Sequence, residues 1–307
     1  MLKPYYEFSD FLKRRFSFKV QKISVNAGFT CPNRDGSKGI GGCTYCNNAT
    51  FNPGYCRTAG QSISAQLEEG VRFFARKYPE MKYIAYFQAY TNTYASIETL
   101  RQKYEEALAF PGVVGLILGT RPDCVPDVLL DYLGKLSEKA FVFIEYGLES
   151  ASDLTLRRIR RGHTWQDSVD AVRRTHERGI LTGAHLILGL PGEEREQLLR
   201  QAGLISALPL TAIKLHQLQI IRHTAMEKEF REHPERFQLY GVEAYADLVI
   251  DFLERLRPDI AVDRFVSQSP RELLIAPDWG LKNHEFTAIV NKRFALRQTR
   301  QGERFMT

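Results

Sequence analysis

Short apolar runs alternate with amphipathic segments along most of the chain, and this alternation limits the fold more than any other feature. The apolar runs predict buried strands, and with one earlier candidate strand they lie at 20–26, 83–87, 113–118, 140–147, 181–189 and 211–221. Segments with helical spacing lie between or after them, at 64–78, 125–137, 164–178, 193–207 and 240–257. Strands that alternate with helices form right-handed βαβ units and a parallel sheet.

The predicted fold class is therefore α/β, a partial (βα)6 TIM-like barrel of parallel strands with a short C-terminal extension. Residues 260–266 are a candidate seventh strand. We assign residues 1–260 to the main domain and residues 261–307 to a basic extension packed on the barrel. An open dinucleotide-binding sheet is disfavoured because no G-x-G-x-x-G opens a helix after the first strand. In parallel α/β folds the site lies at the carboxyl ends of the strands.

Three cysteines follow the first predicted strand, within residues 29–46. Eleven residues separate Cys31 from Cys43, and two separate Cys43 from Cys46. A closed zinc site needs four ligands, and disulfides need pairs. A zinc site would therefore take a further ligand from elsewhere in the chain: Cys56, His163, His185, His216 or His223. A 4Fe–4S cluster held by three thiolates accounts for the number directly and leaves one iron free.

Length, composition and charge limit the class of protein. With 307 residues, 44% of them hydrophobic, the chain can form one large domain with a sizeable core. It begins without the apolar segment of a secretory signal and has no apolar run that could span a bilayer. We therefore expect a cytoplasmic protein without a membrane partner. Residues 1–22, a basic N-terminal arm, and residues 282–307 each carry six Lys or Arg against two acidic residues. Such ends favour solubility or contact with a phosphate backbone.

The cysteine segment AGFTCPNRDGSKGIGGCTYC resembles that of the radical S-adenosylmethionine (radical SAM) superfamily. Within it the chain resembles the YhcC/YtqA-type group, which is related to the radical SAM domain of the Elongator catalytic subunit. The long first gap departs from the usual C-x₃-C-x₂-C spacing and is typical of that group. GLESASDLTLRRIRRGHT (147–164) and LILGLPGE (186–193) resemble the regions around the fourth and fifth strands of related enzymes. The resemblance covers roughly residues 15–260.

The resemblance implies an enzyme that uses a 4Fe–4S cluster and S-adenosylmethionine (SAM) to make a 5′-deoxyadenosyl radical, which abstracts a hydrogen atom. It places Cys31, Cys43 and Cys46 on the cluster ligands. Tyr45 falls on the aromatic residue that packs near the adenine. The resemblance also implies an electron donor such as a flavodoxin or ferredoxin, and it names no further catalytic residue.

Residues on or near later strands also receive roles from the resemblance. Glu149 falls on a polar position that contacts the cofactor, with a cap for the following helix as the alternative. Arg161 falls on the arginine that pairs with the methionine carboxylate, with a solvated charge as the alternative. Gln88 and Thr91 lie where many relatives carry a glycine run that meets the cofactor. His185 lies where some relatives have an aspartate, and it either binds the ribose or is a satisfied inward-facing histidine.

Several other residues receive weaker interpretations. His216 on the sixth strand is a weaker candidate for the substrate side. Cys56 and Cys124 are expected to be small buried side chains. Three aromatic residues could stack on a nucleic acid base, although core packing is the simpler role: Tyr5, Tyr6 and Trp279.

The substrate is less constrained than the chemistry. The Elongator relative acts on the wobble uridine of transfer RNA (tRNA), and YtqA-type proteins point to aminomethyl-type modification of the same base. This chain is too short for the acetyltransferase domain that follows the radical SAM part of Elongator, so we do not expect the same carboxymethylation. We therefore expect tRNA wobble-uridine modification. Two alternatives remain open: a radical SAM enzyme that acts on a small metabolite, and a non-catalytic metal-binding module.

Overall fold

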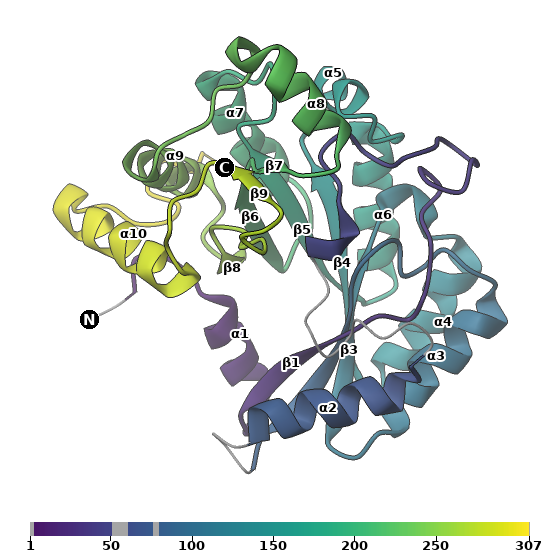
Figure 1. The fold of residues 1–307 in the computed structure, drawn as a ribbon. Coiled ribbons are helices and arrows are strands. Elements are labelled where there is room, and N and C mark those ends of the chain that lie inside the picture. The colour runs from purple at the N-terminus through teal and green to yellow at the C-terminus, as the bar shows by residue number, and fades with distance from the viewer. Residues whose placement is uncertain (1–2, 51–60, 76–79, 307) are drawn as a thin grey trace.

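A seven-stranded parallel sheet curls into a partial barrel in the computed structural model, which describes residues 3–50, 61–75 and 80–306 (Figure 1). Each strand pairs in parallel with the next one in this order: β1 (Val20–Val25), β2 (Lys82–Phe87), β3 (Val113–Thr120), β4 (Phe141–Glu149), β5 (Leu181–Leu188), β6 (Ala212–Gln217) and β8 (Ala261–Arg264). Strands β1 and β8 are the two edges of the described sheet. The predicted α/β partial barrel is confirmed.

The sheet differs from the predicted one at its C-terminal side. The count of six core strands is one short, because the candidate seventh strand, β8, pairs with β6. The predicted boundary at residue 260 therefore falls directly before a strand of the barrel sheet. The predicted strand 211–221 is wrong as a single unit, because Ile220–Ile221 form β7 and pair antiparallel with β9 (Leu274–Ala276). Leu218 and Ile220 pack in a separate apolar cluster with Met226, which draws the chain out of the barrel sheet.

Helices cover the outside of the curl. The described residues form α1 (Phe8–Arg15), α2 (Ile63–Ala75), α3 (Ile97–Ala109), α4 (Asp127–Ser137), α5 (Asp153–Arg158), α6 (Trp165–Glu177), α7 (Arg195–Ser206), α8 (Ala225–Glu232), α9 (Val242–Arg255) and α10 (Asn283–Arg297). The five predicted helices correspond to α2, α4, α6, α7 and α9, and α5 is the helix expected after Glu149, whereas α1, α3, α8 and α10 were not predicted. Thr164 caps α6 as predicted, in a capping box with Asp167. The apolar faces of α2, α3, α4, α6, α7, α9 and α10 and the outward side chains of the strands form the main core, whereas α1, α5 and α8 pack in two smaller apolar clusters.

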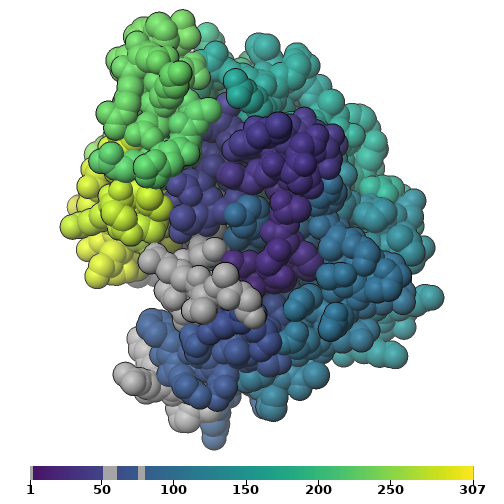
Figure 2. All heavy atoms as spheres, turned by 45° about the vertical axis from the view of Figure 1, so that its right-hand side comes forward, coloured from purple at the N-terminus to yellow at the C-terminus, as the bar shows by residue number. Residues whose placement is uncertain are grey.

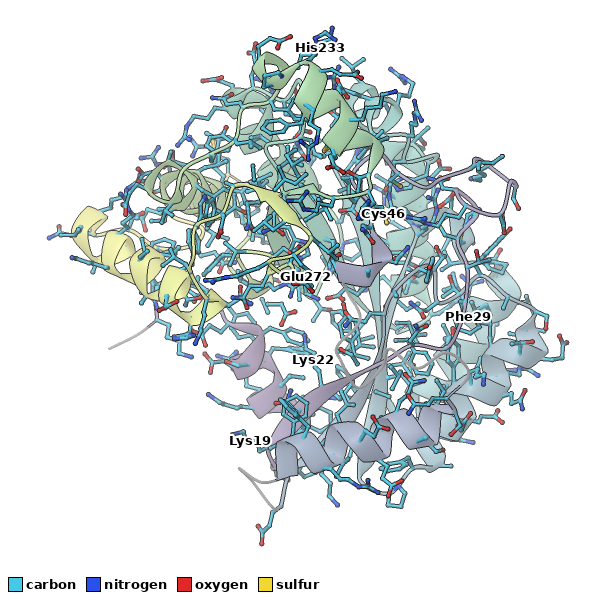
Figure 3. The ribbon with its side chains drawn as sticks, viewed as in Figure 1. Lys19, Lys22, Phe29, Cys46, His233 and Glu272 are labelled. Atoms are coloured by element: carbon cyan, nitrogen blue, oxygen red, sulfur yellow. The ribbon has the colours of Figure 1, made fainter. Side chains whose placement is uncertain are left out.

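A second apolar cluster lies inside the curl. Phe8 of α1 meets Phe143 of β4 edge to face, with ring centroids 5.5 Å apart. Helix α1 also lies against β8, where Val262 N–H donates to Tyr6 C=O over 2.7 Å. Lys22 belongs to β1 and points to this interior, where it forms an ion pair with Asp263 of β8 (Figure 3). Lys22 therefore does not contribute to the exposed positive charge of the predicted basic arm 1–22.

The C-terminal helix packs on the barrel's outer layer. Arg293 and Arg297 of α10 form ion pairs with Asp247 of α9, and Arg297 also pairs with Asp251. Gln301 then ties the chain ends together, because its amide oxygen accepts from Tyr6 N–H and its amide nitrogen donates to two backbone carbonyls beside β8. None of the described helices is both long and apolar enough for a membrane span.

Candidate active site

A cavity lies at the carboxyl ends of the strands, where the sequence predicted the site. Its lining includes the three predicted cluster ligands, Cys31, Cys43 and Cys46. It also includes every predicted cofactor-binding residue: Tyr45, Gln88, Glu149, Arg161 and His185. The residues come from segments as distant as the loop after β1 and strand β5. The curl of the parallel sheet brings them together because all its strands end on the same side.

The cysteine segment forms a loop that its own backbone holds in shape. Arg34 N–H donates to Cys31 C=O over 2.8 Å, and Cys46 N–H donates to Cys43 C=O over 3.0 Å. Gly42 has φ +89°, and a Cβ there would lie 2.9 Å from the Arg34 guanidinium, so the loop needs glycine at this position. That guanidinium donates to Cys46 C=O over 2.8 Å. The outer turn of the loop lies on the molecular surface, within the purple segment of Figure 2.

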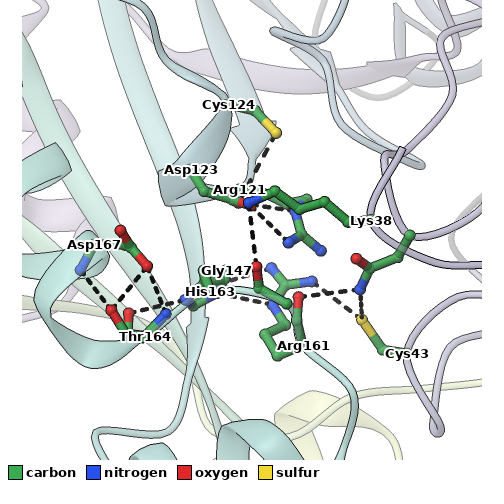
Figure 4. A network of polar contacts seen from close by, with 12 residues as sticks. Lys38, Cys43, Arg121, Asp123, Cys124, Gly147, Arg161, His163, Thr164 and Asp167 are labelled. Atoms are coloured by element: carbon green, nitrogen blue, oxygen red, sulfur yellow. Dashed lines mark hydrogen bonds and ion pairs between the residues drawn. The ribbon is translucent and has the colours of Figure 1, made fainter. Parts of the chain in front are cut away.

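Asn33 connects this loop to the segment before α6. Its amide nitrogen lies 3.3 Å from Cys43 Sγ and donates to the backbone carbonyls of Arg160 and Arg161 over 2.8 and 3.0 Å. The Arg161 guanidinium lies 3.6 Å from the same sulfur (Figure 4). Two buried N–H donors, from Asn33 and Arg161, thus reach the Cys43 thiol. Asn33 lies in the long gap between Cys31 and Cys43 and fixes the loop to the segment before α6.

Arg161 and Glu149 are buried side by side in the cavity wall. Arg161 donates to Gly147 C=O over 2.7 Å and to His163 over 3.1 Å, and it lies 3.5 Å from Glu149 Oε1. Burial lowers the pKa of His163 to about 4, so its ring is a neutral acceptor. Glu149 has φ +67°, a left-handed backbone that turns its side chain toward the arginine at the end of β4. Ser152, not Glu149, accepts the capping hydrogen bond of α5.

A layer of polar and charged groups forms one wall of the cavity and continues behind it, and sequence reasoning named only His185 among them. Glu145 of β4 accepts from Lys214 and Tyr86, and His185 Nε2 lies 3.2 Å from the same carboxylate. Lys214 also lies 3.2 Å from Asp263. Burial raises the Tyr86 pKa and lowers the His185 pKa, so both side chains are neutral near pH 7. The signal in the sequence is a charged residue at the centre of an apolar run, as in FVFIEYG and AIKLHQ.

A model of the radical SAM superfamily matches residues 28–203, more than half of the chain. The chain belongs to the radical SAM superfamily. A model of the radical SAM C-terminal domain matches residues 210–295.

Relatives and solved structures agree with this assignment. The chain is 35% identical over 303 residues to YtqA of Bacillus subtilis, which covers 99% of this chain and 93% of YtqA. It is 38% identical over 273 residues to YhcC of Escherichia coli, which covers 87% and 85% of the two chains. It is 24% identical over 173 residues to the tRNA uridine(34) acetyltransferase of Dehalococcoides mccartyi, 55% of this chain and 36% of that protein. The archaeal Methanocaldococcus infernus Elp3 shares the fold, with a TM-score of 0.68, 16% identity, and coverage of 92% of this chain and 64% of that one.

Radical SAM proteins use a 4Fe–4S cluster and SAM, and the cavity has features that fit both. The described residues contain no set of three or more ligands gathered around a single metal ion, whereas three thiols line one cavity. That arrangement suits a 4Fe–4S cluster, in which three irons would each take one thiolate and the fourth would stay free. Burial raises the pKa of Cys46 to about 11, which favours the protonated thiol. The nearby Arg34 guanidinium and a bound iron would both favour the thiolate instead. Arg121, only 2% exposed, lines the cavity with a buried Nη1 that has no described partner, and such a donor fits an anionic group in the cavity.

The segment after β2 lacks the glycine run of many radical SAM relatives. Ala89 and Tyr90 have φ of 63° and 61°, so the chain reaches a left-handed conformation without glycine. Gln88 donates to Ser24 Oγ over 2.7 Å, and Thr91 is buried with its N–H on Thr30 C=O. Gln88 lines the cavity, and its side-chain amide is hydrogen-bonded to Ser24 of β1.

The remaining predicted residues divide between the cavity and the core. His216 faces the interior and accepts from Arg264. Cys124 is buried and Cys56 lies outside the described residues. Tyr5 and Trp279 pack against other aromatic rings, and Tyr6 lies beneath the guanidinium of Arg14. These contacts favour a packing role over base stacking for all three side chains.

Proposed function

We propose that this radical SAM enzyme cleaves SAM reductively and acts in the modification of the tRNA wobble uridine. The observation that supports the chemistry is one cavity that joins three thiols to the buried Glu149–Arg161 pair. When bound, the cluster and SAM supply an electron and a 5′-deoxyadenosyl radical for hydrogen abstraction. Cys31, Cys43 and Cys46 would hold the cluster. A flavodoxin- or ferredoxin-type donor would deliver the electron.

The chain's own residues then bind and orient the cofactor. Glu149 can accept hydrogen bonds from ribose hydroxyls, because its carboxylate lines the cavity. Arg161 offers a guanidinium to the methionine carboxylate, held in place by Gly147 C=O and His163. Tyr45 lies against an apolar cluster beside the cavity and offers a ring face to the adenine. His185, neutral and next to Glu145, can donate or accept at the ribose.

Support for a tRNA substrate comes from the relatives. One relative is named as a tRNA uridine(34) acetyltransferase, an enzyme that acts on the wobble uridine. Its similarity covers about half of this chain. The match spans 36% of that protein, so its acetyl transfer is not carried over. The charge of the chain ends gives less support than the sequence suggested. Four of the six basic residues in 282–307 form ion pairs with carboxylates: Arg293, Arg297, Arg300 and Arg304.

Anaerobic reconstitution tests the chemistry. Protein loaded with iron and sulfide should turn brown and release 5′-deoxyadenosine when SAM and dithionite are added. A loaded protein that releases none would refute SAM cleavage, and one that binds zinc and stays colourless would indicate a metal-binding module.

Nucleoside analysis tests the substrate. Mass spectrometry of tRNA from cells with and without this gene should show a modified uridine only in the former, or its precursor only in the latter. Binding of bulk tRNA should weaken steeply with salt, because phosphate contacts release counterions. An unchanged nucleoside profile would reject the tRNA substrate and leave a small-molecule substrate for the same chemistry.

A further inference from the structure

The last strand of the barrel places two consecutive charged side chains inside the curl. Ala261 packs in the inner apolar cluster and Val262 in the outer core, so regular alternation would place Asp263 inside and Arg264 outside. The register shifts between Ile213 and Lys214 of β6, which pair with Val262 and Arg264 and leave Asp263 without a partner residue. This bulge lets both Asp263 and Arg264 reach the interior. Arg264 consequently lines the cofactor cavity.

The charges next to Arg264 are already paired with one another. Asp263 lies 2.8 Å from Lys22 and 3.2 Å from Lys214. Glu145 forms its ion pair with Lys214. No carboxylate of the described residues forms an ion pair with Arg264, the third cation of this group. The interior therefore holds three cations and two carboxylates: Lys22, Lys214 and Arg264 with Glu145 and Asp263.

A neutral group holds Arg264 instead of a carboxylate. Its Nη2 and Nε lie 2.8 and 3.1 Å from His216 Nε2. Burial and the guanidinium itself lower the pKa of His216 well below its usual value, so the imidazole accepts without a charge of its own. A half-buried guanidinium with no counter-charge is costly in a region of low dielectric. Such a cost is offset when an anion enters the site.

The position of Arg264 separates it from Arg161, the other guanidinium that the cofactor role invokes. Arg161 is engaged by Gly147, His163 and Glu149 on the β4 side of the cavity. Arg264 lies on β8, next to His216, whose ring centroid is 5.1 Å from that of His185. His185 and His216 together line a second cavity, which shares Tyr45, Glu149 and His185 with the first. Arg264 lines the first cavity and adjoins the second through its hydrogen bonds to His216. Arg264 thus lies where the cofactor cavity meets space that SAM need not fill.

We propose that Arg264 binds an anionic group of the substrate, a carboxylate or a phosphate, and so selects for an anionic substrate. His216 orients the Arg264 guanidinium by accepting hydrogen bonds from Nε and Nη2 along one of its edges. Nη1 and the second N–H of Nη2 then remain for bidentate contact with two oxygens in the cavity that Arg264 lines. The proposal holds for a nucleotide or for a metabolite, and so it stands or fails separately from the tRNA substrate.

Anion binding to the cluster-loaded, SAM-saturated enzyme tests the proposal. Sodium acetate and sodium phosphate, each compared with chloride at equal ionic strength, should raise the midpoint of thermal unfolding. Phosphate also stabilises folded proteins by exclusion from their surface, so the anion whose shift falls more in Arg264→Gln identifies a carboxylate or a phosphate site. Arg264→Gln should weaken that binding roughly tenfold to a hundredfold, because it removes a charged hydrogen-bond donor. Arg264→Lys should weaken it less, because it retains the charge without the fork. Arg300→Gln is the matched control, since it removes an exposed guanidinium that pairs with Glu303, and its shift should equal that of the unaltered enzyme.

Three results would overturn the proposal. One is the same midpoint in acetate, phosphate and chloride for the unaltered enzyme, and another is an equal shift in Arg264→Gln. The third is a tenfold loss of SAM affinity in Arg264→Gln by equilibrium dialysis, which would assign the guanidinium to the cofactor's own carboxylate. The tRNA nucleoside profile does not enter these measurements, so a failure of the tRNA function is seen separately.

Discussion

Glu193 of the LPGE segment is a buried carboxyl group whose ionisation should change the stability of the protein. It is 5% exposed and accepts from Ser150 Oγ over 2.5 Å and from Gln201 Nε2 over 3.0 Å, both at Oε1. Its Oε2 is buried and has no partner among the described residues. Burial raises the pKa of Glu193 to about 7 from the usual 4.5, because desolvation outweighs the hydrogen bonds to its charged form. The folded protein therefore favours the protonated acid.

The direction of the pH effect follows from this raised pKa. Below about pH 4.5 the carboxyl is protonated in the folded and unfolded states alike, and its burial has no electrostatic cost. As pH rises, the unfolded state ionises first, so the free energy of unfolding falls until the folded state ionises near pH 7. The full loss corresponds to about 3 kcal/mol, at about 1.4 kcal/mol for each pH unit between the two pKa values. Glu193→Gln replaces the protonated acid by a neutral group of the same shape and removes this loss.

Urea unfolding of the loaded protein and of Glu193→Gln, followed by circular dichroism, measures the effect. The variant should gain stability over the unaltered protein as pH rises, by about 2 kcal/mol between about pH 5.5 and pH 8. Glu303→Gln is the control, because it makes the same substitution at a half-exposed carboxylate away from this buried site. A difference between Glu193→Gln and the unaltered protein that stays flat with pH would refute the reasoning. Such a result would mean that Glu193 is ionised in the folded state.

Three further predictions address the site and the charged interior. Cys43→Ser should lose the visible absorption and most of the bound iron after reconstitution, whereas Cys124→Ser should retain both; equal iron content in the two variants would contradict the assignment of the thiols. Lys214→Met should lower the free energy of unfolding by about 3–5 kcal/mol, because Glu145 and Asp263 lose the cation that they share. Urea midpoints within error of the unaltered protein would show that these ion pairs are solvated. Gly147→Ala places a Cβ 2.5 Å from Arg161 Nη2, so SAM affinity measured by equilibrium dialysis should fall about tenfold or more; unchanged affinity would separate Arg161 from cofactor binding.

Most of the fold was predictable because its signals are local. Apolar runs bounded by helical segments predicted six of the seven strands, and the cap at Thr164 fixed the start of α6. Helix α3 was missed because only Leu100, Tyr104 and Ala107 form its buried stripe, amid charged neighbours. The break between β6 and β7 was missed because apolar residues recur from 212 to 221 and no Gly or Pro marks a turn there. Whether such a segment continues in one sheet depends on which distant cluster its side chains meet.

The candidate site was predictable where chemistry and spacing are both specific. The three cysteines and the residues implied by the family resemblance line one cavity. The alternatives given for Glu149 and Arg161 failed for a tertiary reason: both side chains are buried at the end of β4, which no count of neighbouring charges could show. The role of the long cysteine gap was also hidden. Asn33 acts through Cys43 and through carbonyls more than a hundred residues away.

The sequence by itself determined the alternation of strands and helices, the side of the sheet that carries the site, and the thiols available to the cluster. These follow from side-chain periodicity and from ligand chemistry, which are written in short stretches of the chain. Only the tertiary structure decided which charges are paired. Lys22 and Asp263 are 241 positions apart and meet inside the barrel, while a bulge in β8 turns Arg264 toward the cavity without a carboxylate partner among the described residues. Charge pairing depends on distance and burial, and both arise only when the sheet has curled.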